Sequence, residues 1–225
     1  MKINLYDNPE QFPYIVVDDV YNEKELGLIW TELDFLCYDD KLFDPIQAGS
    51  AMESDNGKEW KSKKKNRSIF LDGLYSRRSV SDILTLNRKT FNIVREVRDQ
   101  KQGSWWIKNL KTNNDTTMVA YYEDSDYYSS HFDNAVFTAL TWFYREPKRF
   151  EGGNLRFTEY NLDIECKTNR AVIFPSSIFH KVYKVTMEKE YRGNKLGRWC
   201  MTQFGSMLDE FELQKDGSVI PMPLN

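Results

Sequence analysis

The stretch Met118-Val-Ala-Tyr-Tyr-Glu-Asp-Ser-Asp-Tyr-Tyr-Ser-Ser-His-Phe-Asp133 places a histidine and a carboxylate two residues apart after a strand-like run. Residues i and i+2 of an extended segment point to the same side, so His131 and Asp133 can present an imidazole and a carboxylate together. The only other histidine of the chain, His180, ends the run Phe174-Pro-Ser-Ser-Ile-Phe-His180. A second strand of the same fold could bring its imidazole to the first two groups.

These three side chains have the chemistry of a metal site. Two imidazoles and one carboxylate on one face of a metal leave positions open, as in non-haem iron(II) oxygenases. The His-x-Asp spacing alone is a weak signal, and a single histidine is more often a hydrogen-bonded structural residue. The metal interpretation is favoured because both histidines stand beside strand-like segments and an arginine, Arg198, opens a later one.

Short strand-like runs surround this stretch and are bounded by turn residues. They span residues 104–110, 116–122, 136–144, 154–157, 171–174, 181–185 and 198–204. Many short strands at this spacing predict a β-sandwich or barrel. No GxGxxG motif or P-loop is present, and Gly152-Gly153 is interpreted as a tight turn.

The N-terminal part has a different pattern. Residues 14–19 predict a short buried strand, and residues 22–33 predict a helix with Asn22 as its N-cap. Residues 39–66 are polar and predict a long surface loop. A second helix is predicted over residues 79–100, where apolar residues recur at helical spacing.

Composition restricts the class of protein. The chain has 225 residues, with 31 basic against 34 acidic side chains and a net charge of −3, which argues against a dedicated nucleic-acid binder. The basic run at residues 61–67 is interpreted as a solvated loop. Three separated cysteines (Cys37, Cys166 and Cys200) indicate no disulfide framework, and no apolar run is long enough for a membrane span. We therefore expect a soluble cytoplasmic protein, and the residue usage suggests a bacterial or viral origin.

Alternation places Arg198, Cys200, Thr202 and Phe204 on one face of the strand at residues 198–204. If that face lines a barrel, the buried guanidinium requires an anionic partner, which a dicarboxylate could supply through bidentate hydrogen bonds. The opposite face, with Trp199, could equally face inward. The pattern leaves both orientations open.

The motif region resembles that of prolyl 4-hydroxylase-type Fe(II)- and 2-oxoglutarate-dependent dioxygenases. Their pattern Tyr-x-x-Gly-x-x-Tyr-x-x-His-x-Asp is matched by Tyr122, Ser125 in place of glycine, Tyr128, His131 and Asp133. Three further elements resemble the family in the same order: the Gly-Gly turn in residues 151–157, the strand with the second histidine in residues 171–185, and the anchor strand in residues 197–205.

The resemblance implies a fold. We expect a mainly β (α+β) protein whose core is a double-stranded β-helix, or jelly roll, with supporting N-terminal helices. The chain would form a single dioxygenase domain of residues 1–225. Within it, residues 1–102 would hold the N-terminal strand, helices and polar loop, residues 103–206 the catalytic core, and residues 207–225 a C-terminal tail.

The resemblance also implies cofactors and their residues. Fe(II) would be bound by the catalytic set His131, Asp133 and His180. The cosubstrate 2-oxoglutarate would bind this iron, and its far carboxylate would meet Arg198, Tyr122 and Thr202. Molecular oxygen would be the third reactant, with ascorbate as a supporting reductant.

Two departures from the family pattern bear on the anchor. Arg198 follows His180 at a longer spacing than in the family, so Lys184 and Arg192 remain alternative anchors, although Arg198 begins the strand. Phe143 stands where many relatives carry a second cosubstrate-binding tyrosine.

The implied function is hydroxylation of a protein or peptide residue, with proline as one candidate, and release of succinate and CO2. Tyr128 and Phe204 are candidate substrate contacts, and residues 39–66 could close over the site as a lid. A nucleic-acid or small-molecule 2-oxoglutarate oxygenase is an alternative, but the related nucleic-acid demethylases carry a second arginine where Phe204 stands. A non-catalytic jelly-roll binding module is the other alternative. We expect no membrane partner, and the sequence leaves the oligomeric state open.

Overall fold

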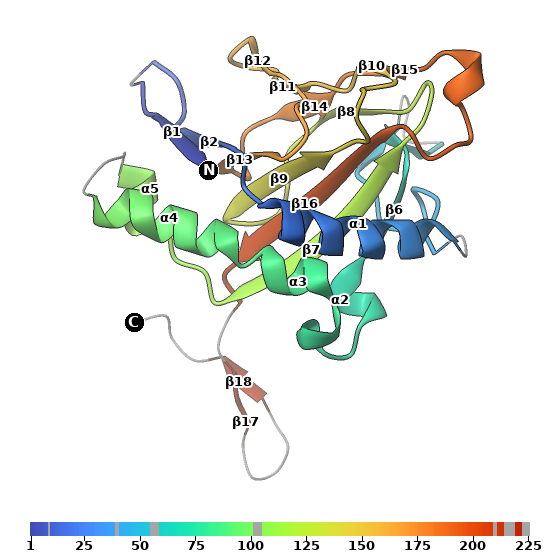
Figure 1. The fold of residues 1–225 in the computed structure, drawn as a ribbon. Helices are drawn as coiled ribbons and strands as arrows, with labels where there is room; N and C mark the ends of the chain where they lie inside the picture. The colour runs from blue at the N-terminus through green and yellow to red at the C-terminus, as the bar shows by residue number, and fades with distance from the viewer. Residues whose placement is uncertain are drawn as a thin grey trace.

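Two sheets face each other in the computed structural model, which describes residues 1–225 except 9, 39–40, 55–58, 101–104, 209–210, 214–218 and 222–225. The larger sheet has the strand order β1-β2-β13-β9-β16-β7-β6, and the smaller has the order β12-β11-β14-β8-β5. Helices α1, α3 and α4 cover the outer face of the larger sheet (Figure 1). This is the expected mainly β jelly-roll architecture with helical support, and the prediction of the fold class is confirmed.

The strands of the larger sheet are β1 (Lys2–Tyr6), β2 (Tyr14–Asp18), β6 (Arg67–Phe70), β7 (Asn114–Tyr122), β9 (Phe137–Phe143), β13 (Arg170–Pro175) and β16 (Arg198–Ser206). Those of the smaller sheet are β5 (Lys64–Lys65), β8 (Tyr127–His131), β11 (Leu155–Phe157), β12 (Leu162–Ile164) and β14 (His180–Val182). The two-stranded pairs are β3 (Met52–Glu53) with β4 (Lys61–Ser62), β10 (Glu151–Gly152) with β15 (Val185–Thr186), and β17 (Phe211–Leu213) with β18 (Val219–Pro221). The helices are α1 (Glu23–Tyr38), α2 (Leu71–Leu74), α3 (Asp82–Leu86), α4 (Lys89–Asp99) and α5 (Trp105–Asn109), with short 3-10 turns η1 (Arg78–Val80) and η2 (Lys189–Tyr191).

The larger sheet separates two hydrophobic clusters. The outer cluster joins the sheet to the helices and includes Trp199 of β16 and Leu33 of α1. The inner cluster lies between the sheets and includes Trp142 of β9 and Phe157 of β11. Both faces of the central strands are buried. Every position of β9 is therefore buried, and its sequence is apolar except for two threonines, without the alternation of a half-exposed strand.

The first helix follows its sequence signals and is longer than predicted. Asn22 Oδ1 accepts a hydrogen bond from the Glu25 backbone N–H at 3.0 Å, and Glu25 Oε2 accepts one from the Asn22 N–H at 2.8 Å. This reciprocal capping box fixes the beginning of α1. The helix then continues to Tyr38, because Leu36 extends the buried stripe beyond the predicted end at Leu33.

Two sequence predictions in the next segment are wrong. The helix predicted over residues 79–100 is divided into η1, α3 and α4, because the hydroxyl of Ser81 caps a new helix through the Leu84 N–H at 3.0 Å. The strand predicted over residues 104–110 is the short helix α5 where it is described, from Trp105 onward. Its single fully buried residue, Ile107, packs against the outer cluster while Trp105 is exposed, so the alternation expected of a strand is absent.

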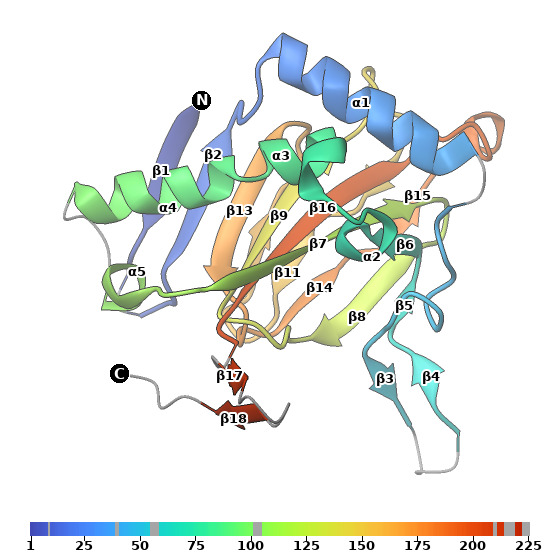
Figure 2. The ribbon, with the colours of Figure 1, turned by 90° about the horizontal axis from the view of Figure 1, so that it is seen from below.

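The predicted loop at residues 39–66 contains three short strands in its described part. The β3–β4 pair extends away from the sheets, and β5 pairs with β8 at the edge of the smaller sheet (Figure 2). Residues 39–40 and 55–58 of the proposed lid lie outside the described residues. The basic run is therefore not a solvated loop throughout, since Lys64 is 3% exposed.

Backbone turns support the smaller sheet. Ser125, which stands in place of the family's glycine, has a φ of 65°, and its N–H donates to the Val185 carbonyl at 2.8 Å. Gly152 and Gly153 have φ values of 73° and 72°, which confirms the tight turn before β11. Among the described residues, none of the helices combines the length and hydropathy that crossing a bilayer needs.

Candidate active site

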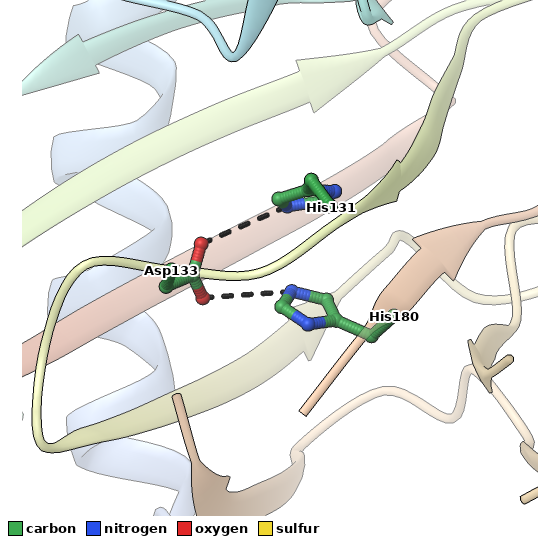
Figure 3. A group of neighbouring side chains, drawn as sticks. All are labelled: His131, Asp133 and His180. Carbon is green, nitrogen blue, oxygen red and sulfur yellow. Dashed lines mark ion pairs between the residues drawn. The ribbon is translucent and has the colours of Figure 1, made fainter. Parts of the chain in front are cut away.

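The two histidines and Asp133 meet at the smaller sheet. His131 ends β8, His180 begins β14, and the two residues are paired across these antiparallel strands. Figure 3 shows both imidazole rings directed toward the Asp133 carboxylate. His131 Nε2 lies 3.7 Å from Asp133 Oδ1, and His180 Nε2 lies 3.5 Å from Asp133 Oδ2. One ligand atom from each residue lies within 4.8 Å of the others, so these side chains can share one metal ion.

Backbone carbonyls orient both rings. His131 Nδ1 lies 2.8 Å from the Ser129 carbonyl oxygen, and His180 Nδ1 lies 2.9 Å from the Ile178 carbonyl oxygen. A carbonyl can only accept, so each Nδ1 donates its proton there and each Nε2 is directed toward Asp133. Burial, and then the nearby charge of His180, lowers the pKa of His131 to about 3, which keeps that ring neutral.

Two residues that the sequence analysis missed, Thr138 and Ser176, position Asp133 through hydrogen bonds. The Thr138 hydroxyl donates to Asp133 Oδ2 at 2.6 Å and lies 2.8 Å from the Ser176 hydroxyl. The Asp133 N–H donates to the Ser176 carbonyl at 2.9 Å. Thr138 and Ser176 are both fully buried. For Thr138, a hydroxyl inside the otherwise apolar run of β9 was the signal in the sequence that could have indicated it.

Arg198 lies in the same pocket on β16 and is fully buried. None of its guanidinium nitrogens has a hydrogen-bond partner among the described residues. The guanidinium carbon Cζ lies 4.5 Å from the centre of the Tyr122 ring, because pairing of β16 with β7 places Arg198 opposite Tyr122. A Cβ at Gly153 would come within 2.8 Å of Arg198 Cδ, so that glycine makes room for the side chain. The Arg198 face of β16 therefore points inward, which decides between the two orientations.

The alternative anchors point elsewhere. Arg192 is exposed, pairs with Asp124 at 3.2 Å and donates to the Met187 carbonyl. Lys184 is also exposed, and neither side chain lines the pocket. Phe143 lies in the outer cluster, on the opposite face of the sheet from the pocket. No hydroxyl at position 143 could reach the site, since the β9 residue that lines the pocket is Leu140.

The other predicted residues line this pocket, which has a volume of about 550 Å³ including space open to solvent. Thr202 and Phe204 follow Arg198 along β16. The ring of Phe204 packs against that of Phe70, with 6.1 Å between the ring centres. The Tyr128 ring stacks on the His131 ring, with 3.6 Å between the ring centres. The Tyr128 hydroxyl accepts a hydrogen bond from the Ala51 N–H at 3.3 Å. Tyr128 therefore supports the His131 ring in addition to facing the cavity.

Burial raises the pKa of the Tyr122 phenol, although the charge of Arg198 opposes that rise. The hydroxyl thus remains protonated and can donate a hydrogen bond in the pocket. Lys64 of β5 also lines the pocket, although nothing in its run of similar basic residues distinguishes it from its neighbours.

Comparison with known proteins agrees with this geometry. Residues 117–205 match the family model described as the 2OG-Fe(II) oxygenase superfamily. A PKHD-type hydroxylase from Delftia acidovorans is 30% identical over 84 residues, which cover 31% of this chain and 37% of that relative. The chain thus matches much less than two thirds of this curated relative.

Two solved structures share the fold. A prolyl-4-hydroxylase from Pseudomonas putida aligns with a TM-score of 0.58 and 13% identity, over 88% of this chain and 95% of that one. The viral collagen prolyl hydroxylase from Paramecium Bursaria Chlorella virus-1 aligns with a TM-score of 0.53 and 14% identity, over 87% of this chain and 96% of that one. At these identities the likeness establishes the fold, while the family match covers the residues that hold the His131, Asp133 and His180 cluster and Arg198. Residues 117–205 are therefore similar to the 2OG-Fe(II) oxygenase superfamily, on a match that covers less than half of the chain.

Proposed function

We propose that this oxygenase domain uses Fe(II), 2-oxoglutarate and O2 to hydroxylate a residue of a protein or peptide, releasing succinate and CO2. One observation carries the proposal. A cluster of two imidazoles and one carboxylate shares a pocket with a fully buried arginine whose guanidinium has no hydrogen-bond partner among the described residues. An unpaired buried cation is costly, so the pocket is suited to a ligand that brings a carboxylate.

The donor set fits ferrous iron. Two imidazoles and one carboxylate form the facial set of non-haem Fe(II) oxygenases, and His131, Asp133 and His180 would hold the metal. When bound, iron and 2-oxoglutarate supply the oxidative chemistry that inserts one oxygen atom into a C–H bond. Thr138 would fix the orientation of the carboxylate through its 2.6 Å hydrogen bond.

The cosubstrate anchor follows from the second part of the pocket. The guanidinium of Arg198 would pair with the far carboxylate of 2-oxoglutarate, and the hydroxyls of Tyr122 and Thr202 would donate to it. Burial of all three side chains excludes water and strengthens these contacts. Phe204 and Tyr128 would limit the volume that is left for substrate.

The substrate class rests on the relatives. The curated relative is named a hydroxylase, and the two aligned structures are prolyl hydroxylases. Proline in a peptide is therefore the first substrate to test. Nucleic-acid demethylation has less support, because Phe204 occupies the position at which the related demethylases carry a second arginine. We also propose that residues 1–102 support the catalytic core of residues 103–206 and that residues 207–225 form a tail.

The test is turnover by the whole chain. The protein, loaded anaerobically with Fe(II), would be mixed with 2-oxoglutarate, ascorbate, O2 and a peptide library that includes proline-containing sequences. Succinate formation and peptides heavier by one oxygen atom are expected, and methylated oligonucleotides provide the competing substrate. His131→Ala should abolish both signals, whereas Arg192→Met, remote from the pocket, should retain them. Absence of succinate from folded, iron-loaded protein under all of these conditions would refute the proposed activity.

A further inference from the structure

Lys64 is a second buried cation in the pocket, and the proposed chemistry assigns it no role. It belongs to β5, the edge strand of the smaller sheet that pairs with β8 beside the metal-ligand cluster. Its side chain lines the pocket that also contains Asp133 and Arg198, and the residue is 3% exposed. The ammonium nitrogen donates to the Ser68 hydroxyl at 2.9 Å and lies 5.9 Å from the centre of the Tyr128 ring.

These contacts leave the ammonium group incompletely paired. An ammonium group has three donors, and Ser68 accepts from one of them. Among the described residues, no carboxylate forms an ion pair with Lys64, whereas its exposed neighbour Lys65 lies 3.8 Å from Asp126. Burial lowers the pKa of Lys64 to about 8, so the group remains mostly charged at neutral pH. A charged lysine is rarely this buried unless an anion accompanies it.

The charges of the loaded pocket indicate which molecule brings that anion. Among the described residues that line the pocket, Lys64 and Arg198 are cations and Asp133 is the acid. The two positive charges of Fe(II) and the two negative charges of 2-oxoglutarate cancel. Arg198 and Asp133 also cancel, so Lys64 leaves one positive charge that neither the metal nor the cosubstrate neutralises.

We propose that Lys64 is a carboxylate-binding residue of this pocket, separate from the Arg198 anchor, and that the carboxylate it holds belongs to the substrate. This inference rests on the proposed function and deepens it, because it makes the substrate acidic near the oxidised position. An aspartate or glutamate side chain in a peptide carries the required group. The other source of the same chemistry is 2-oxoglutarate itself, and the experiment separates the two.

The test measures binding by full-length protein loaded with Zn(II), a diamagnetic substitute for the active metal. Calorimetry gives the affinity for 2-oxoglutarate, and saturation-transfer NMR then measures acetate binding to protein saturated with 2-oxoglutarate. Acetamide is the neutral control ligand. Lys64→Met removes the charge inside the pocket, and Lys65→Met removes one charge from the exposed neighbouring position.

Lys64→Met should weaken acetate binding about tenfold or more, the loss expected for one charge-assisted hydrogen bond, and should leave 2-oxoglutarate affinity within about twofold. Lys65→Met should bind acetate as the wild type does, and Lys64→Arg should restore binding. A tenfold loss of 2-oxoglutarate affinity with unchanged acetate binding would overturn the assignment to substrate and place the carboxylate on the cosubstrate.

Unchanged affinity for both ligands would overturn the proposal altogether. A structural role would show instead as a lower melting temperature, whereas removal of an unpaired buried charge should leave that temperature equal or higher. If Lys64→Met does not fold, Lys64→Gln is a second neutral variant that can still reach Ser68. These are binding measurements, so absence of succinate from the wild type would refute the proposed function without changing this result.

Discussion

Replacing Arg198 with methionine should have opposite effects on ligand binding and on stability. Arg198 is fully buried on β16, and its guanidinium nitrogens lack hydrogen-bond partners among the described residues. Methionine has a similar length, carries no charge, and fits the space beside Gly153, which already accommodates an unbranched side chain. The variant therefore removes the proposed anchor without creating a large cavity.

The magnitudes follow from the buried charge. Truncating one partner of a buried ion pair costs about 2–5 kcal/mol, so 2-oxoglutarate should bind the variant at least roughly 30-fold more weakly. In the ligand-free protein the same arginine is an uncompensated cation. Replacing it with an apolar side chain should leave the free energy of unfolding unchanged or raise it by about 1–4 kcal/mol.

Calorimetric titration of 2-oxoglutarate into the metal-loaded protein, and urea unfolding of the ligand-free protein, measure the two effects. Arg192→Met is the matched control, because it removes the same charge from an exposed residue that pairs with Asp124. It should leave 2-oxoglutarate affinity unchanged. The reasoning fails if Arg198→Met binds 2-oxoglutarate normally, or if Arg192→Met is the variant that loses affinity.

Three further substitutions test other parts of the structure. Thr138→Val removes the 2.6 Å hydrogen bond to Asp133 and should weaken Fe(II) affinity about 10- to 100-fold in a chelator competition, with little change in fold by circular dichroism. Burial raises the pKa of Asp126 to about 6 from 3.8, so the native state retains its proton longer than the unfolded state as pH rises. The wild type should therefore lose unfolding free energy between about pH 4 and pH 6 relative to Asp126→Asn, by roughly 1 kcal/mol after solvent screening of this partly buried group, as measured by urea unfolding. Asn22→Ala opens the capping box of α1 and should lower the unfolding free energy by about 1 kcal/mol in the same assay, whereas an unchanged value would show that the cap does not hold the helix.

Short-range patterns predicted a β-sandwich or barrel, and the family resemblance narrowed this to a jelly roll. The same patterns also indicated three side chains that meet in space. The His-x-Asp spacing fixes two ligands on one side of an extended chain, and His180 is brought to them by pairing of β14 with β8. The capping residue of α1 was also a local signal.

Predictions failed where tertiary contacts override local pattern. The apolar stripe of residues 79–100 predicted one helix, but two polar contacts interrupt it. Ser81 caps the beginning of α3, and after α3 the Asn87 side chain donates to the Thr117 hydroxyl of β7 at 2.5 Å. The stripe marks the buried face but not the continuity of the helix. Apolar residues alternate weakly over residues 104–110, and the packing of Ile107 in the outer cluster favoured the helix α5 over a strand.

Lys64 shows the same limit at the site. It stands among lysines that are chemically alike, and the register of β5 against β8 decides which of them is buried. Lys64 lies opposite Tyr128, whose ring stacks on His131, while Lys65 lies opposite the exposed Tyr127. A one-residue shift of this pairing would bury Lys65 instead. A basic run therefore cannot indicate a pocket residue until its strand partner is known.

The sequence also left open whether the Arg198 side chain points into the fold, for a related reason. Both faces of β16 are buried, one under the helices with Trp199 and the other in the pocket, so alternation alone gives no preference. Neighbouring residues determine the orientation of Arg198 in the structure. Arg198 pairs with Tyr122 of β7, and Gly153 leaves space for the arginine side chain. If Arg198 is the 2-oxoglutarate anchor that we propose, binding of the carboxylate would return the stability that the unpaired guanidinium costs, and affinity for that ligand would be part of the energetics of the fold.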